Sequence, residues 1–194
     1  MLFICLAVFG CAANSEITKI KKVFVFEPYS GGHLDQVMVV GKPRFETVRK
    51  QYEDYLSAVL KKRGIDAIPS YLAIPELSNV NLRNVAKVAQ RDRIKTLLAA
   101  KIVGVDEKVA IFKESLSYGY IATPHGVFMQ PYIEGPRVEK TTNVRIEAGL
   151  FDIQSGKLLW GVTSEVMDPN SVDEAIKDFS NAIINQLIID GYIR

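Results

Sequence analysis

The chain has 194 residues, of which 48% are hydrophobic and 24% are charged, and its formal net charge at pH 7 is +2. These values are typical of one ordinary globular domain and exclude a disordered or fibrous chain. Because a net charge this small gives no electrostatic basis for binding phosphate backbones, we expect no nucleic-acid partner.

The N-terminus is an apolar run from Leu2 to Ala13. A helix needs about 20 apolar residues to cross a bilayer, so this run is too short for a membrane span. An apolar stretch of roughly 7 to 15 residues that ends in small residues is typical of a cleaved export signal, and Gly10 directly precedes Cys11. The positive charge of such signals is missing, since the first basic residue is Lys19, and this favours a translation start upstream of Met1.

These residues resemble the lipobox of bacterial lipoproteins, with Val8 and Gly10 at the expected offsets from Cys11. The resemblance implies cleavage before Cys11, whose sulfur would carry diacylglycerol and whose amine would carry an acyl chain, with no other cofactor. Ala12 in the next position implies transfer to the outer membrane, facing the periplasm. The alternative interpretation is a buried first strand or helix that merely contains Cys5 and Cys11, the two cysteines of the chain.

This interpretation divides the chain into a signal peptide over residues 1–10, a lipidated tether over 11–21 and a single periplasmic α/β domain over 22–194. Residues 23–26 predict a buried strand. Residues 45–60 have apolar side chains at spacings of three and four, which predict a helix that ends at Gly64. Residues 66–70 predict a second strand. The apolar run 37–40 is either a second contact surface or an additional edge strand.

The apolar positions from Leu82 to Ile102 predict a second helix. Residues 108–123 have the composition of a long strand, and residues 138–153 alternate between apolar and polar side chains as in a sheet with one wet face. A turn over residues 154–157 returns into a strand over 158–166, and Ser171 with Glu174 predicts the capping box of a last helix. The order β-α-β-α-β-β-β-α predicts an α+β fold, with a mixed sheet of about five strands covered by three helices.

The segment Gly-Leu-Phe-Asp-Ile-Gln-Ser-Gly-Lys-Leu-Leu-Trp, residues 149–160, is the sharpest motif in the domain. Together with the order of elements, it resembles the small periplasmic lipoprotein domains related to the TolB N-terminal domain, whose relatives include curli-secretion-channel subunits and lipoprotein activators of penicillin-binding proteins. Its content is structural, because Gly156 allows a tight turn, Asp152 bonds that turn and Trp160 buries a large area. Fold alone does not transfer an activity.

The sequence offers no catalytic constellation. His33 and His125 are the two histidines, and they lie in separate turn-rich segments without a nearby cysteine, so a metal site has little basis. Ser30 and Asp35 lie too close to His33 in sequence for a triad. We therefore expect a protein that is not an enzyme. The alternative is a periplasmic small-ligand-binding or hydrolytic protein that uses the His33 and His125 loops.

Residues 124–136 predict a long loop between two strands, and its apolar side chains suit contact with a partner protein. The candidate contact residues are Phe128, Met129, Tyr132 and Ile133. The other possibility is that the loop buries these side chains in its own domain. The predicted function is that of a lipid-anchored, non-enzymatic periplasmic protein that acts through protein–protein contacts in envelope assembly, secretion or regulation of cell-wall synthesis. Its partners would be the membrane and an envelope protein, and a homo-oligomer is left open.

Overall fold

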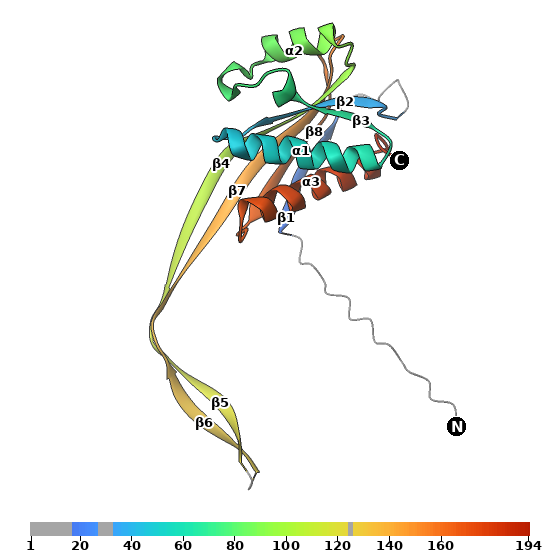
Figure 1. Ribbon diagram of the computed structural model, residues 1–194. Helices are drawn as coiled ribbons and strands as arrows, with labels where there is room; N and C mark the ends of the chain where they lie inside the picture. The colour runs from blue at the N-terminus through green and yellow to red at the C-terminus, as the bar shows by residue number, and fades with distance from the viewer. Residues whose placement is uncertain (1–16, 27–32, 124–125) are drawn as a thin grey trace, which may run out of the picture.

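A computed structural model describes residues 17–26, 33–123 and 126–194. The main sheet has six strands in the order β1-β8-β7-β4-β2-β3, and β5 and β6 form a separate two-stranded sheet. Figure 1 shows α1 and α3 side by side on one face of the main sheet, with α2 near one end. The predicted α+β class with three helices is confirmed, although the main sheet has six strands rather than about five.

The first strand, β1 (Thr18–Val25), is an edge strand that pairs antiparallel with β8. It begins at Thr18, ahead of the expected start of the domain at residue 22. The predicted strand at residues 23–26 is confirmed for residues 23–25, but the prediction that it is buried is wrong, because this part of the edge strand is exposed. Phe24 is 44% exposed, and its ring stacks on that of Phe26 with centroids 6.1 Å apart.

The apolar run at residues 37–40 lies in β2 (Gln36–Lys42), which is parallel to both β3 and β4. It is therefore an interior strand, and it is neither an edge strand nor an exposed contact surface. Val37, Met38 and Val39 expose no surface. A strand that is covered on both faces is expected to be continuously apolar, as this one is.

The helix predicted over residues 45–60 is confirmed as α1 (Glu46–Lys62), and the strand that follows it is β3 (Asp66–Pro69). Gly64, with a φ of +81°, takes the left-handed backbone conformation that ends the helix. Two short 3₁₀ helices, η1 (Ser70–Leu72) and η2 (Leu77–Asn79), lie between β3 and α2 in the chain.

The second predicted helix is shorter than expected, because α2 (Leu82–Arg91) ends before β4 (Thr96–Phe112) begins. Leu97 and Ile102 therefore lie in a strand and not in a helix. Arg93 has a φ of +57°, and the Ile94 amide donates to the Ala89 carbonyl oxygen at 2.8 Å. This bond closes the helix end in the way that a glycine usually does, without a glycine to mark it in the sequence.

Four further strands complete the β-structure: β5 (Ser115–Thr123), β6 (Gly126–Glu134), β7 (Arg137–Asp152) and β8 (Leu158–Met167). The predicted turn between β7 and β8 is confirmed. The Ser155 amide donates to Asp152 Oδ2 at 2.9 Å, the Ser155 hydroxyl donates to the same oxygen, and Gly156 has a φ of +69°. The hydrogen bonds from Ser155, its hydroxyl first, lower the pKa of Asp152, so this carboxylate stays ionised as the cap of the turn.

The last helix, α3 (Val172–Ile189), begins as predicted, with the Glu174 amide donating to Ser171 Oγ at 3.1 Å. It packs with α1 over the apolar face of the sheet, where Trp160 has no exposed surface. The indole nitrogen of Trp160 donates to Asp190 Oδ2 at 2.7 Å, just beyond the end of α3. Trp160 therefore joins the sheet to the C-terminal helix, as the hairpin motif predicts.

The sheet has a second, smaller core on its opposite face. There α2 and the segment before it cover β2 and the first part of β4, with Met38, Val85 and Leu97 among the buried residues. On this face α2 lies over β2 and β4, and it does not extend over the neighbouring strands β7 and β8.

Candidate functional site

The four candidate contact residues lie in a strand, so the prediction of a loop over residues 124–136 is wrong. Phe128, Met129, Tyr132 and Ile133 belong to β6, which pairs antiparallel with β5 from Ser115↔Glu134 to Thr123↔Gly126. The alternation of aromatic and β-branched residues suits a strand once a second strand is available to pair with it. The described residues of the segment thus form a hairpin, which we call the tip hairpin.

One face of the tip hairpin is apolar throughout its described side chains. Residues that pair directly across two antiparallel strands point to the same face, and alternate residues of each strand do so too. The pairs Leu116↔Ile133 and Tyr118↔Pro131 therefore share a face with Met129 and Val127. We call these six residues the tip face: Leu116, Tyr118, Val127, Met129, Pro131 and Ile133.

The tip face is exposed. Leu116 is 61% exposed, Met129 is 61% exposed and Ile133 is 71% exposed, so the possibility that the segment buries its apolar side chains in its own domain is not realised for these residues. Tyr132 points to the opposite face, where its ring lies against Gly119. The side chain of Phe128 lies outside the described residues.

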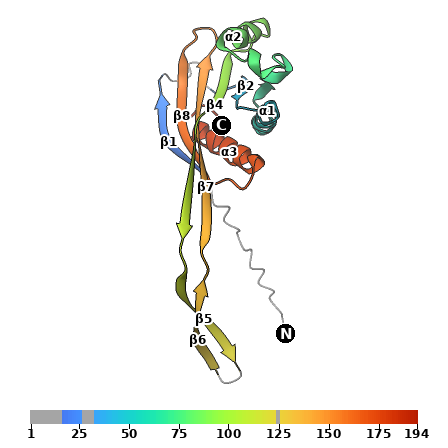
Figure 2. The same cartoon turned by 90° about the vertical axis from the view of Figure 1, so that its left-hand side faces the viewer.

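The tip hairpin stands at the end of a two-stranded stem formed by β4 and β7 (Figure 2). The pairing of β4 with β2 ends at Lys101, and the pairing of β7 with β8 reaches only to Asn143. The stem, from the pair Glu107↔Thr142 to the pair Phe112↔Arg137, has no further strand beside it among the described residues. A strand rises about 3.3 Å per residue, so residues 103–112 extend β4 roughly 30 Å beyond the end of its pairing with β2.

One face of the stem carries three exposed apolar side chains beside the ion pair of Lys140 and Glu107. Val109, Ile111 and Val138 share this face and are 60%, 74% and 66% exposed. A two-stranded hairpin is only marginally stable in water by itself, and exposed apolar surface on this scale usually marks a site of interaction. The stem and tip therefore form an exposed apolar surface that projects from the body of the domain.

Ion pairs link the two strands of the stem and of the segment just before it, and the pair of Glu107 and Lys140 lies on the same face as Val109. Lys140 Nζ lies 2.9 Å from Glu107 Oε2, and Arg145 Nε lies 3.2 Å from Asp106 Oδ2. The Arg137 guanidinium stacks over the Phe112 ring at 4.8 Å, where the stem meets the tip hairpin. Because such exposed pairs contribute little to stability, their main effect is to fix which residues face each other.

Of the two histidines, the structure describes His33 only. His33 is exposed and precedes β2 in the body of the domain. His125 lies outside the described residues, and its described neighbours Thr123 and Gly126 pair with each other at the far end of the tip hairpin. Among the residues that the structure describes, no three His, Cys, Asp or Glu side chains are grouped to hold a metal ion.

A buried polar cluster joins α1 to the sheet, and neither sequence pattern nor charge pointed to it. Glu53 Oε1 accepts from Arg49 Nε at 2.9 Å, from the Gly41 amide at 2.9 Å and from the Ser70 hydroxyl at 2.7 Å. Glu53 Oε2 accepts from the Tyr71 amide at 2.8 Å. Arg49 and Glu53 have no exposed surface, so a substrate cannot reach them and the cluster is structural.

Cys11, the predicted lipidation site, lies outside the described residues. In the described part of the chain, none of the helices is both long and apolar enough to cross a membrane.

The sequence matches no protein-family model and no curated protein. Its fold is similar to that of the PelC dodecamer from Paraburkholderia phytofirmans, at 12% identity and a TM-score of 0.48, over 91% of this chain and 99% of that one. It is also similar to lipoprotein GNA1162 from Neisseria meningitidis, at 16% identity and a TM-score of 0.43, over 80% of this chain and 99% of that one.

A third solved structure with a similar fold is a putative neuraminyllactose-binding hemagglutinin homolog from Helicobacter pylori. The two chains are 10% identical, with a TM-score of 0.41, over 84% of this chain and 85% of that one. At these scores the similarity extends to neither an activity nor a partner.

Proposed function

We propose that this protein is a lipid-anchored, non-enzymatic module of the bacterial envelope, held at the outer membrane by Cys11, that binds an envelope protein through its stem and tip hairpin. The observation that carries the contact role is the exposed tip face at the end of an extended two-stranded stem. Met129 would supply a side chain of a type that is enriched at interfaces, with the exposed Ile133 side chain on the same face.

The arrangement suits a contact at a distance from the body of the domain. The tip hairpin is separated from the stem by Lys113 and Glu114 on one side and by Gly135 and Pro136 on the other, which stand between the paired segments. Proline lacks an amide hydrogen and so interrupts the ladder at this point. The tip can therefore take an orientation of its own when it meets a partner.

Replacing Met129 with Asp should lower the yield of the co-purified partner at least about tenfold, because a charge would be placed in the apolar centre of the contact. The measurement is crosslinking in whole cells, followed by affinity purification of the full-length chain and identification of the partner by mass spectrometry. Gln130→Asp is the matched control, since Gln130 is the next residue of β6 and points to the opposite face. Equal loss in both variants, or loss in neither, contradicts the assignment of the tip face.

Replacing Cys11 with Ser should abolish the incorporation of radiolabelled palmitate and leave the precursor uncut. Cys5→Ser is the matched control, because Cys5 lies in the segment that cleavage would remove and its change should leave labelling intact. Labelling that survives Cys11→Ser would overturn the anchor and leave the contact role of the tip face to be judged by the crosslinking experiment alone.

A further inference from the structure

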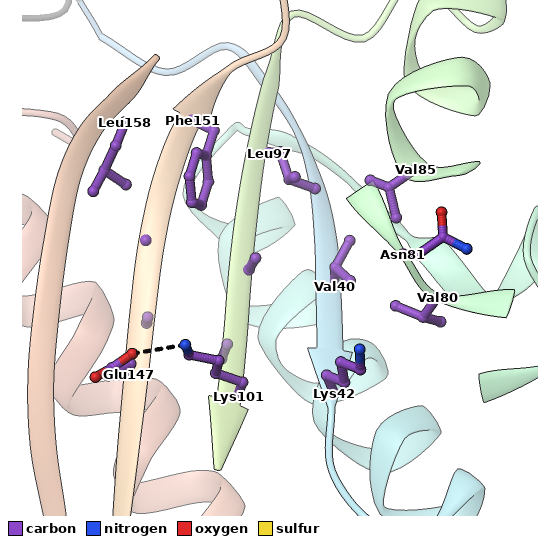
Figure 3. Close-up of a pocket in the computed structure, with 14 residues that line it drawn as sticks. Val40, Lys42, Val80, Asn81, Val85, Leu97, Lys101, Glu147, Phe151 and Leu158 are labelled. Atoms are coloured by element: carbon purple, nitrogen blue, oxygen red, sulfur yellow. Dashed lines mark ion pairs between the residues drawn. The ribbon is translucent and has the colours of Figure 1, made fainter. Parts of the chain in front are cut away.

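The sheet face that α2 leaves partly uncovered carries a narrow groove with a cavity volume of about 350 Å³. Its floor is formed by β2, β4 and β7, and its walls come from the start of α2 on one side and from Phe151 and Leu158 on the other (Figure 3). Val40, Leu97 and Val85 line it while exposing 5% or less of their surface, so the groove is a recess rather than a flat patch.

The two ends of the groove differ in chemistry. Figure 3 shows Phe151, Leu158 and Leu97 at one end, and Lys42, Lys101 and Glu147 at the other. Lys101 Nζ lies 3.0 Å from Glu147 Oε2, and these two charges offset each other. Lys42 forms no ion pair with any residue in the described part of the chain. The polar end therefore carries a net positive charge.

The groove is poorly suited to a peptide. The strands of its floor are interior strands of the sheet, in the order β8-β7-β4-β2, so their backbone groups already pair with each other. Apart from Asn81, whose side-chain oxygen caps α2, the polar side chains that line the groove lie at the lysine end. The amides of a peptide in the apolar part would lose water and find no partner, which is costly.

A hydrocarbon chain has no polar groups that need hydrogen-bond partners in the groove. The volume is at the small end of the roughly 300–1,000 Å³ of ligand pockets, which suits one acyl chain rather than two. Ala99, between Val40 and Gly149 on the floor, keeps the middle of the groove open. Gly149 lies under the side chains of Leu158 and Phe151, which close over it at the apolar end.

We propose that this groove binds the single acyl chain of an anionic amphiphile, a fatty-acid carboxylate, with its head group at Lys42 and Lys101 and its tail toward Phe151 and Leu158. This site is separate from the stem and the tip hairpin. The proposal about it therefore does not depend on the proposed contact function.

The test is photo-crosslinking of the full-length chain, held in lipid nanodiscs, with dodecanoate that carries a diazirine at its terminal carbon. Mass spectrometry should find the crosslinks near Phe151 and Leu158, because the reactive group is at the end of the tail. Unlabelled dodecanoate should compete for the site, whereas dodecyltrimethylammonium should not. Crosslinks that map elsewhere, or failure of dodecanoate to compete, overturn the proposal.

Two pairs of variants separate the parts of the site. Ala99→Phe fills the middle of the groove and should lower crosslinking about tenfold or more, whereas Ala110→Phe, on the exposed part of the same strand, should leave it unchanged. Lys42→Glu should raise the half-saturating concentration of dodecanoate about fivefold, and Lys87→Glu on the exposed side of α2 should not. Equal effects within either pair, with all four variants shown to be folded by circular dichroism, contradict the proposed site.

Discussion

Replacing Glu53 with Leu is expected to lower the free energy of unfolding by about 3–5 kcal/mol, the usual cost of breaking a buried ion pair by removing one partner. The substitution leaves the Arg49 guanidinium buried without its carboxylate. It also removes the acceptor of the Gly41 and Tyr71 amides, which connect α1 to β2 and to η1. Because a domain is stabilised by only about 5–15 kcal/mol in total, the loss should lower Tm by roughly 10 °C or more.

Arg49→Leu should be the milder of the two changes, because Glu53 would still accept from the Gly41 amide, the Tyr71 amide and the Ser70 hydroxyl. The measurement is thermal and urea unfolding of the full-length chain and its variants, followed by circular dichroism. Lys177→Ala is the control, since it breaks an exposed ion pair with Asp173 at 2.6 Å, and it should leave the midpoint unchanged. An effect of Glu53→Leu no larger than that of Lys177→Ala would show that the buried cluster does not hold α1 to the sheet.

The burial of Tyr52 beside this cluster supports the same structural role. Burial, with the neighbouring Glu53 carboxylate as a second cause, raises the pKa of Tyr52 far above its usual range, so the phenol stays neutral. Its ring packs against Phe179 of α3, with centroids 6.0 Å apart. The cluster therefore lies where α1, α3 and the sheet meet, and its cost of desolvation is offset by complete hydrogen bonding of Glu53.

The elements that the sequence predicts well are those decided by local pattern. In α1, α3 and the β7–β8 hairpin, the apolar period, the cap at Ser171 and the turn at Gly156 agree with one another, and the structure follows them. Consistency between several local signals is what makes such segments predictable.

The elements that were mispredicted depend on distant partners. In β2 the run of apolar residues has no alternation, because neighbours on both faces cover it. The end of α2 has Arg93 where a glycine would announce the stop, so Leu97 and Leu98 continue the apparent helical pattern into β4. Tertiary pairing overrides local propensity at both places.

The candidate site also contains residues that local pattern predicts and residues that only strand pairing identifies. Composition predicted Phe128, Met129, Tyr132 and Ile133 as contact residues, and that role stays a prediction. The structure places Met129 and Ile133 on the tip face, together with Leu116 and Tyr118, which were not predicted. Their alternation with Ser115 and Ser117 is visible in the sequence, but only the register with β6 places them on the face of Met129 and Ile133. The buried pair of Arg49 and Glu53 carried an i,i+4 spacing that is equally common on exposed helix faces.

Replacing residues 113–136 with Asn-Gly, so that a tight turn joins the pair Phe112↔Arg137, is expected to reduce partner capture to background while leaving the unfolding of the body unchanged. The described side chains of the tip hairpin belong to neither core cluster, so their loss removes no packing from the sheet and helices. The tip face, in contrast, supplies the apolar centre of the proposed contact, and loss of such a centre costs far more than loss of its rim.

The measurement pairs urea unfolding of the shortened chain with the crosslinking and affinity purification used for Met129→Asp. A second chain keeps the full length but has Ser at the tip-face positions Leu116, Met129 and Ile133, and it should lose the partner to the same extent. Because the second chain keeps the tip hairpin, equal loss in both chains shows that partner capture needs the apolar side chains of the tip face and not the hairpin backbone alone. If the shortened chain still captures the partner while the body stays folded, the contact lies on the stem or the sheet; if the body unfolds as well, the tip is part of the fold rather than a surface added to it.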